Sequence, residues 1–194
     1  CLRYKGERIE VQNYIDDTGV QVVDVVFGLI ELEKKSLAEI EKMTGRFDYY
    51  CWDLYARVSK YLGENEQARK QRAEILKKIE QGQSPEADYA HLVSRRILRA
   101  HLATMSRLDI SYDVLPCESS ILRLKFWEKA FTRLKEAGAI YYSNEGETAG
   151  CWVMKLEGKE EREKIIVRSD STVTYVGKDI AYQLWKFGLL GQDF

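Results

Sequence analysis

The sequence predicts an α/β fold that is interrupted by a long helical insertion. Alternating or β-rich segments lie near both ends of the chain, turns and helical patterns follow them, and the middle of the chain is helical throughout. We expect residues 1–45 to form a strand, a turn and a helix, residues 46–108 the helical insertion, and residues 109–194 a second α/β segment with a hairpin. Polar side chains at the strand-to-helix turns are the candidate binding residues.

The composition is that of an ordinary globular protein, with 45 % hydrophobic and 31 % charged residues among 194. The longest apolar run, Val20 to Ile30, is interrupted by Asp24 and is too short to span a membrane. The formal net charge of −1 argues against a protein that binds nucleic acid by overall charge. The chain starts at Cys1 without a methionine and stops at Phe194 without a charged tail, which indicates a piece of a longer protein.

The cysteines and histidines show no metal-binding or redox pattern. The cysteines are scattered without a CxxC pair, which indicates reduced thiols and a cytoplasmic location: Cys1, Cys51, Cys117 and Cys151. His91 and His101 are ten residues apart and have no carboxylate at ligand spacing beside them, so we expect no metal site. The P-loop, GxGxxG, GxSxG and HExxH motifs are absent from the sequence.

The first segment matches the opening half of a βα unit. Arg8 to Tyr14 alternates apolar and polar residues as a strand does, and the turn Asp16 to Gly19 leads into a helical pattern from Val20 to Met43. Gly45 is expected to end this helix. The N–H groups of the turn could hold an anion, or the turn could only cap the helix; both interpretations stay open.

The insertion is predicted to contain three helices: Phe47 to Leu62, Glu64 to Glu80 and Glu86 to Leu108. Gly63 is expected to separate the first two. The first helix is rich in aromatic residues. We expect most of its rings to lie in the core or against a neighbouring segment rather than to stack on bases.

The helical insertion is basic. From Arg57 to Arg107 there are eleven Lys or Arg residues against six Asp or Glu. Arg95, Arg96 and Arg99 lie in a stretch without acidic residues and could contact a phosphate backbone. Equally, they could be surface arginines paired with acidic residues of the preceding helix.

The last segment is predicted to hold several strands and two helices. Asp109 to Pro116 is the first of these strands, and Ile121 to Ala137 is an amphipathic helix that Gly138 ends. Three short β segments follow, with hairpin chemistry between the first two: Ala139 to Ser143, Cys151 to Leu156 and Lys164 to Val167.

The most informative stretch is Arg168 to Phe187. A turn at residues 169–171 leads into a β-rich run, Thr172 to Val176, and a helix is predicted to begin near Lys178. Tyr175 and Asp179 are four residues apart, so they share a face if the helix begins slightly earlier. A carboxylate beside an aromatic ring suits a cationic ligand, although the same pair could be a first-turn acid and a packed tyrosine.

Three segments together resemble the catalytic core of arginyl-tRNA synthetase, a class I aminoacyl-tRNA synthetase with a Rossmann-like fold. They are VQNYIDDTGVQVVDV (Val11 to Val25), SYDVLPCESSILR (Ser111 to Arg123) and RSDSTVTYVGKDIAY (Arg168 to Tyr182). The segments occur in the order of the family, and the resemblance covers essentially the whole chain. It implies that Tyr175 and Asp179 contact the substrate L-arginine, with Asp179 holding the guanidinium.

The resemblance also implies the reaction and the partners. Arginine would be activated with ATP, helped by magnesium, and the arginyl group would pass to tRNA. The stretch with Asn13, Asp16, Asp17 and Gln21 would lie beside the active site. The basic helices would lie near the tRNA acceptor end, with contacts from three arginines: Arg95, Arg96 and Arg99.

The sequence departs from the family in its missing signatures and in one turn residue. The HIGH-type signature that would precede Arg8 and the KMSKS-type loop that would follow Phe194 are absent, as is the anticodon-binding domain. The chain alone is therefore not expected to form the adenylate or to hold a cofactor. Ser171 stands where the family usually has glycine, and a positive φ there would cost serine about 1 kcal/mol.

We therefore expect the catalytic-core fragment of a cytoplasmic arginine–tRNA ligase, inactive by itself and monomeric, with no membrane association. Two other classes stay open. One is a synthetase-like paralogue that binds arginine or tRNA without aminoacylation. The other is a structural domain whose basic helices dock a partner.

Overall fold

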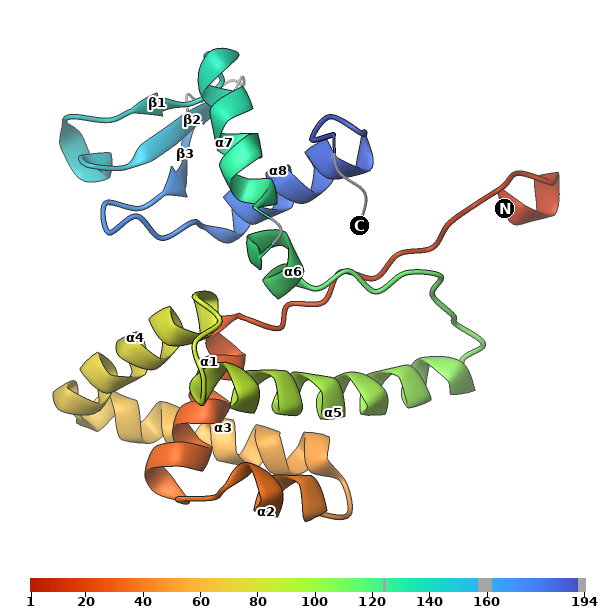
Figure 1. The fold of residues 1–194 in the computed structure, drawn as a ribbon, viewed down its shortest axis with the longest axis vertical. Coiled ribbons are helices and arrows are strands. Elements are labelled where there is room, and N and C mark those ends of the chain that lie inside the picture. Colours follow the sequence, from red (N-terminus) through yellow and green to blue (C-terminus); the bar gives the residue numbers. More distant parts are fainter. Residues whose placement is uncertain (124, 157–161, 192–194) are drawn as a thin grey trace. The chain divides into compact units, whose positions relative to one another are not determined.

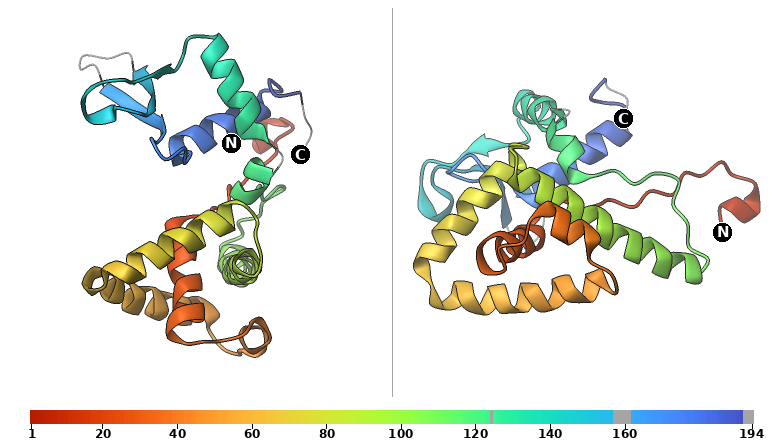
Figure 2. Two further views of the ribbon diagram at one scale, coloured as in Figure 1. Left: turned by 60° about the vertical axis from the view of Figure 1, so that its left-hand side comes forward. Right: turned by 60° about the horizontal axis from the view of Figure 1, so that its bottom comes forward.

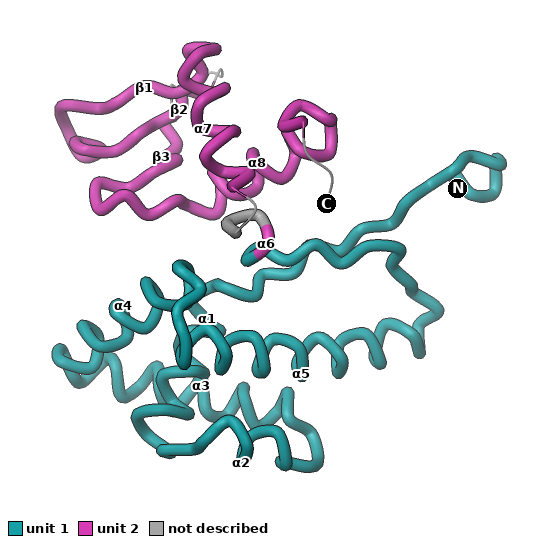
Figure 3. Tube along the Cα trace, in the orientation of Figure 1, with its two compact units in different colours: residues 1–119 teal, residues 120–194 magenta. Residues whose placement is uncertain are grey.

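The computed structural model describes residues 1–123, 125–156 and 162–191. The chain forms two compact units, residues 1–119 (unit 1) and residues 120–194 (unit 2) (Figure 3). The three-part division expected from the sequence stays a prediction.

Unit 1 is mainly helical (Figure 1). Its elements are η1 (Arg3–Lys5), α1 (Val20–Phe27), η2 (Gly28–Leu32), α2 (Leu37–Lys42), α3 (Phe47–Glu64), α4 (Glu66–Glu80) and α5 (Glu86–Arg107). α6 (Glu118–Arg123) begins at its end. The three helices expected in the insertion are confirmed, although α3 runs through Gly63 instead of ending there.

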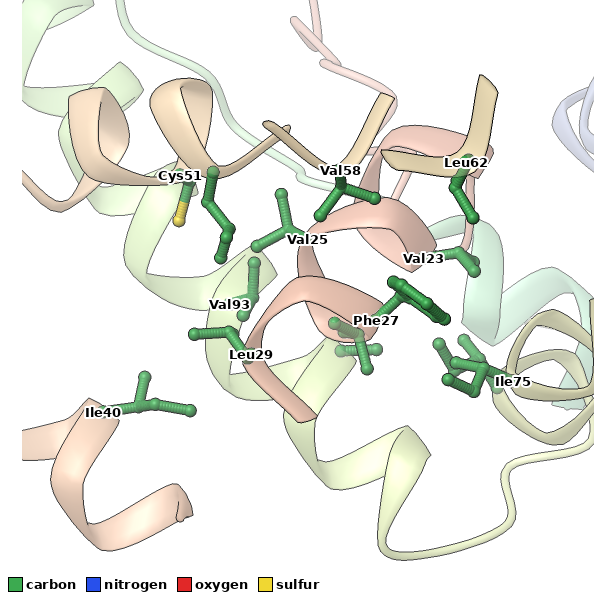
Figure 4. Close-up of a cluster of buried hydrophobic side chains, with 14 of the residues drawn as sticks. Val23, Val25, Phe27, Leu29, Ile40, Cys51, Val58, Leu62, Ile75 and Val93 are labelled. Atoms are coloured by element: carbon green, nitrogen blue, oxygen red, sulfur yellow. The ribbon is translucent and has the colours of Figure 1, made fainter. Parts of the chain in front are cut away.

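Helix α1 is the centre of unit 1, and α3, α4 and α5 pack around it. Its sequence is apolar on nearly every side, which is typical of a fully buried helix. Figure 4 shows the core, with residues from six elements: Val23, Val25 and Phe27 (α1), Leu29 (η2), Ile40 (α2), Cys51, Val58 and Leu62 (α3), Ile75 (α4) and Val93 (α5). At Gly28 a Cβ would lie 2.7 Å from Val58 and 2.8 Å from Leu54, so glycine permits this close packing.

The single helix expected from Val20 to Met43 is wrong. α1 passes into the π-helical turn η2, and the chain then leaves the helix at Lys34, whose φ is 52°. α2 begins after Ser36, which forms a capping box with Glu39. The Ser-Leu-Ala-Glu spacing is a helix-start signal that the apolar periodicity concealed.

The two predicted strands of unit 1, Arg8 to Tyr14 and Asp109 to Pro116, are not regular strands. They pair only at isolated parallel bridges, Gln12 with Val114 and Ile15 with Cys117. The Asn13 N–H donates to the Val114 carbonyl at 3.1 Å, and the Ile15 N–H donates to Pro116 at 2.8 Å. The two segments therefore run side by side in the same direction.

Unit 2 packs two helices with a small antiparallel sheet. Its elements are α7 (Phe126–Glu136), β1 (Tyr141–Tyr142), η3 (Gly146–Thr148), β2 (Trp152–Leu156), β3 (Arg162–Val167) and α8 (Tyr175–Lys186). The strand order is β1-β2-β3, with Tyr141 opposite Val153 and Val153 opposite Ile165. The three β segments predicted after the amphipathic helix are thereby confirmed in position.

Two predictions for the last segment are wrong. The helix expected from Ile121 to Ala137 is two helices, α6 and α7, because Lys125 has a left-handed backbone with φ 58°. The β-rich run from Thr172 to Val176 is not a strand: only Val173 bridges to Val167, and α8 begins at Tyr175. The fold is therefore mixed, with helices and one small sheet among the described residues.

The aromatic residues of α3 divide between its two faces. Tyr50 and Tyr55 are half-buried against the core. Tyr49, Trp52 and Tyr61 are 61 %, 68 % and 40 % exposed, so these three rings do not follow the expectation that most of them pack against the protein.

Candidate functional site

The first candidate site is the turn between β3 and α8 in unit 2. The turn is closed by backbone bonds from the Arg168 N–H to the Thr172 carbonyl and from the Ser171 N–H to the Arg168 carbonyl, both 2.9 Å. The Asp170 carboxylate accepts from the Thr172 hydroxyl at 2.7 Å and from its N–H at 2.9 Å. These bonds hold the pKa of Asp170 below its usual value. Ser171 has φ 69°, so this position does require the left-handed backbone.

Thr174 fixes the start of α8 to the sheet. Its buried hydroxyl donates toward the carbonyl of Ile165 at 2.8 Å, and it accepts from the Gly177 N–H at 3.4 Å as the N-cap. Its own N–H donates to the Ile166 carbonyl at 2.9 Å. The first turn of α8 is thereby tied to β3.

Gly177 lets this first turn approach the sheet closely. A Cβ on Gly177 would lie 2.8 Å from Val173 and 3.1 Å from both the Ile166 carbonyl and the Trp127 ring. No larger residue fits without a shift of the helix or its neighbours.

Tyr175 and Asp179 lie one turn apart on the exposed side of α8. The helix begins at Tyr175 rather than near Lys178, so the two residues are at helical positions i and i+4 and share a face. Tyr175 is 69 % exposed and Asp179 is also exposed, whereas Lys178 between them is buried. A solvent-facing phenol ring and a carboxylate can together receive a planar cation.

The second candidate site joins two turns of unit 1. The Asp17 carboxylate accepts from the Ser119 N–H at 2.8 Å and from its hydroxyl at 2.6 Å. The Glu118 carboxylate accepts from the Thr18 hydroxyl and, at 3.2 Å, from the Tyr14 hydroxyl. Asp17, Thr18 and Glu118 are all buried, so these bonds fasten the two turns together in a water-poor environment.

The sequence did not single out Glu118 or Thr18. Glu118 lies 100 residues from Thr18 in the chain, and only the parallel pairing brings them together. The buried side-chain contact could not be found from local spacing. The sequence offers one signal for a site at Glu118, which is the Cys-Glu-Ser-Ser run that follows a predicted strand.

The Asp16 carboxylate lies at the turn before α1, where the sequence suggests that backbone N–H groups could hold an anion. The Asp16 carboxylate fills the space that a Cβ on Gly19 would need, so it lies directly against the N-cap residue of α1. The N-terminus of α1 therefore faces the chain's own negative charge. Of the other residues expected beside an active site, Asn13 is half-buried and Gln21 is exposed on the first turn of α1.

The three arginines of α5 differ in their surroundings. The Arg96 guanidinium donates to the Ile40 carbonyl and, at 2.6 Å, to the Met43 carbonyl, and it lies 3.9 Å from the centroid of the Phe47 ring. Arg96 therefore ties α5 to the end of α2 and the start of α3. Arg95 and Arg99 are exposed, and neither forms an ion pair within the part of the chain that the structure describes. The alternative pairing with the acidic residues of α4 is not seen there.

The described residues form neither a metal-binding cluster nor a membrane-spanning helix. Among residues 1–123, 125–156 and 162–191, no group of three or more His, Cys, Asp or Glu side chains could hold a metal ion. Within the same ranges, no helix has both the length and the apolar character to cross a membrane.

Comparison with solved structures gives the class of protein. The chain matches the arginyl-tRNA synthetase of Thermus thermophilus with a TM-score of 0.68 and 31 % identity, over 97 % of this chain and 31 % of that one. The arginyl-tRNA synthetase of Plasmodium falciparum has the same fold over 95 % of this chain, with a TM-score of 0.67 at 12 % identity. The fold is thus that of a part of an aminoacyl-tRNA synthetase.

Sequence relatives narrow this class. The chain is 35 % identical to the arginine–tRNA ligase of Thermococcus kodakarensis and 37 % identical to that of Pyrococcus abyssi, over 99 % of this chain in both cases. No family model matches the chain. The chain spans about a third of the length of these relatives, 32 % in both. It is therefore homologous to a segment of arginyl-tRNA synthetase.

Proposed function

We propose that this chain is the part of an arginine–tRNA ligase that binds the arginine side chain. The observation that carries the proposal is the exposed pair Tyr175 and Asp179, one turn apart at a helix start, in a chain homologous to that enzyme. The Asp179 carboxylate would accept two parallel hydrogen bonds from the guanidinium, and the Tyr175 ring would lie against its face.

The whole protein would activate L-arginine with ATP and transfer it to tRNA. The arginine carboxylate would attack the α-phosphate of ATP to give arginyl-adenylate and pyrophosphate. A hydroxyl of the terminal ribose of tRNA would then attack the arginyl carbonyl, and AMP would leave. Magnesium would help to neutralise the ATP phosphates. Residues 1–194 contain neither a HIGH-type nor a KMSKS-type motif, so the phosphates would be held by residues outside this stretch.

The extended segments of unit 1 would belong to a Rossmann-like core. Their two bridges are parallel, as in the sheet of such a fold, and each segment leads through a turn into a helix. Such folds bind ligands at the carboxyl ends of their parallel segments. Asp16 and Asp17 follow that end of the first segment, whereas Asn13 lies between the two bridges and Gln21 lies in the first turn of α1. Because Asp17 is engaged by Ser119, its part would be to hold the turn in place.

Exposed arginines of α5 would contact tRNA. Arg95 and Arg99 lack ion-pair partners within the described residues and point to a phosphate ligand. Arg96 would support this surface through its bonds to two backbone carbonyls instead. We also propose a cytoplasmic, monomeric protein.

Arginine-dependent exchange of pyrophosphate into ATP tests the proposed function in the full-length gene product. With tRNA present in the assay, a working ligase exchanges pyrophosphate into ATP when arginine is supplied and not when lysine replaces it, because the site fits a planar guanidinium. A synthetase-like paralogue would bind arginine without exchange. A protein that neither binds arginine nor exchanges pyrophosphate would be a structural domain, and the proposal would be refuted.

A further inference from the structure

Aromatic rings gather in unit 2, where they come from α7 and from the two strands that follow it in the chain (Figure 2). The centroid of the Phe131 ring in α7 lies 5.0 Å from that of Trp152 in β2, and the two ring planes are at 85°. Tyr142 of β1 is paired directly with Trp152, and their ring centroids are 5.5 Å apart. Because directly paired residues lie on the same face of a sheet, the three rings form one cluster beside α7.

The side chain of Lys135 reaches over this cluster. Its ammonium nitrogen lies 4.8 Å from the centroid of the Trp152 ring and 5.5 Å from that of the Phe131 ring. Phe131 and Lys135 are one turn apart on α7, so the ammonium lies over a ring of its own helix as well as over a ring of the sheet. We call Phe131 and Trp152, together with Tyr142 beside Trp152, the aromatic cage.

The aromatic cage differs from the other contacts between lysines and rings in unit 2. Lys155 lies 5.8 Å from the centroid of the Tyr141 ring and Lys186 lies 5.3 Å from that of the Tyr182 ring, so each of these lysines contacts one ring. In the cage, two rings at a steep angle attract the same cation, because each presents the negative face of its π-system. Sites that recognise cationic ligands through aromatic rings are built in this way.

Lys135 is held weakly, so another cation can replace it. Its side chain is exposed and forms no ion pair within the part of the chain that the structure describes. Exposed contacts between an ammonium and a ring are weak, and a lysine ammonium loses favourable hydration when it makes them. Phe131 and Trp152 are half-buried and Tyr142 is 47 % exposed, so the rings can be reached once Lys135 turns away.

We propose that the aromatic cage binds a quaternary ammonium group, such as that of choline or of trimethylated lysine, and that Lys135 occupies the cage when this ligand is absent. The methyl groups of such a ligand pack against the rings while the positive charge is kept, whereas the ammonium of lysine is strongly hydrated. The ligand therefore displaces Lys135. The proposal involves neither Tyr175 nor Asp179, so it holds or fails independently of the proposed function.

Nuclear magnetic resonance of the 194-residue chain tests the proposal, with choline as the probe. The indole N–H signal of Trp152, identified by its absence in Trp152→Phe, should shift and saturate as choline is added. The neutral analogue 3,3-dimethylbutan-1-ol has the same shape without the charge, and it should bind about tenfold more weakly because the rings attract a cation. Equal affinity for the two molecules would overturn the proposal, as would the absence of any shift at millimolar choline.

Lys135→Ala tests whether this lysine occupies the cage. Removal of the competing ammonium should strengthen choline binding about two- to fivefold, the factor expected for one exposed cation–π contact. Lys186→Ala is the matched control and should leave the affinity unchanged, because Lys186 is also exposed in the last turn of a helix but lies over Tyr182. An unchanged or weaker choline affinity in Lys135→Ala would contradict the proposed exchange.

Phe131→Leu removes one ring of the cage and keeps an apolar side chain at the position. It should weaken choline binding about tenfold, and Phe131→Tyr, which restores a ring, should bind choline as the unmodified chain does. Unchanged affinity in a folded Phe131→Leu would refute the cage, and circular dichroism establishes that the variants are folded. Phe131 also packs against the core of unit 2, so the comparison of choline with its neutral analogue decides the proposal if Phe131→Leu does not fold.

A short peptide with one trimethylated lysine distinguishes the two sources of the ligand. Tighter binding of this peptide than of choline assigns the ligand to a modified protein side chain, and tighter binding of choline assigns it to a free small molecule. The same peptide with unmodified lysine should bind more weakly than its trimethylated form, because its ammonium is more strongly hydrated. Equal binding of the two peptides would contradict the preference for a quaternary ammonium.

Discussion

At the scale of single residues, Ser171 adopts a backbone conformation that is unfavourable for a residue with a Cβ. Its φ of 69° lies in the region where a Cβ crowds the neighbouring carbonyl, and the turn before α8 requires that conformation. Ser171, which stands where the family usually has glycine, is therefore at a strained backbone position.

Ser171→Gly should stabilise the protein by about 0.5–1 kcal/mol. The substitution removes the Cβ strain, and the greater freedom of glycine in the unfolded chain offsets part of the gain. Urea unfolding measures the change. Ser169→Gly in the same turn, where φ is not positive, should destabilise instead. Equal effects of the two substitutions would contradict the account.

At the scale of elements, the start of α8 depends on its contact with β3. The Thr174 cap and the close approach at Gly177 set where the helix begins, and they thereby place Tyr175 and Asp179 on one face. A change at Gly177 should therefore affect both stability and ligand binding.

Gly177→Ala should destabilise unit 2 by about 1–3 kcal/mol, because its Cβ would overlap Val173 and the Ile166 carbonyl. Gly63→Ala is the matched control. Gly63 also lies within a helix, α3, but nothing lies within 4 Å of its added Cβ. This control should stabilise by about 0.5–1 kcal/mol, as expected for alanine in a helix. Thermal unfolding of both variants measures the two changes. Stabilisation by both substitutions would contradict the close packing at Gly177.

The sequence predicted which helices and strands form better than it predicted where they begin and end. The helices α3, α4 and α5 and the three short strands follow from periodicity and turn residues, because those signals are local. The break at Lys34 and the shift of α8 to Tyr175 do not, since a left-handed residue and a cap to a distant strand depend on tertiary contacts. The same limit hid the bonds to Glu118, which join residues about 100 positions apart.

At the scale of the whole molecule, stability at low pH should depend strongly on Glu33. This carboxylate follows η2 and contacts α3: it accepts from the Tyr50 hydroxyl and pairs with Arg57 and, at 2.9 Å, with Lys35. Burial alone would raise the pKa of Glu33, but the hydrogen bonds outweigh it and lower the pKa to about 2.

The sign of the pH effect follows from this lowered pKa. The contribution of Glu33 is complete above about pH 4.5 and is lost as the pH falls through about 2. Urea unfolding between pH 2 and 7 should show a loss of stability that is smaller in Glu33→Gln by an amount on the order of 2 kcal/mol. Glu136→Gln, which removes an exposed carboxylate of α7, is the matched control. An identical profile in Glu33→Gln would contradict this role.

The central claim is that Asp179 and Tyr175 hold the guanidinium of arginine, and titration calorimetry tests it most directly. Arginine is titrated into the full-length protein and its Asp179→Asn variant, with Glu136→Gln as the control for loss of one exposed carboxylate. We predict that Asp179→Asn weakens arginine binding by about 2 kcal/mol, roughly 30-fold, because a charge-assisted bidentate pair is lost. Arginine affinity that is the same in Asp179→Asn and in the unmodified protein would contradict the claim.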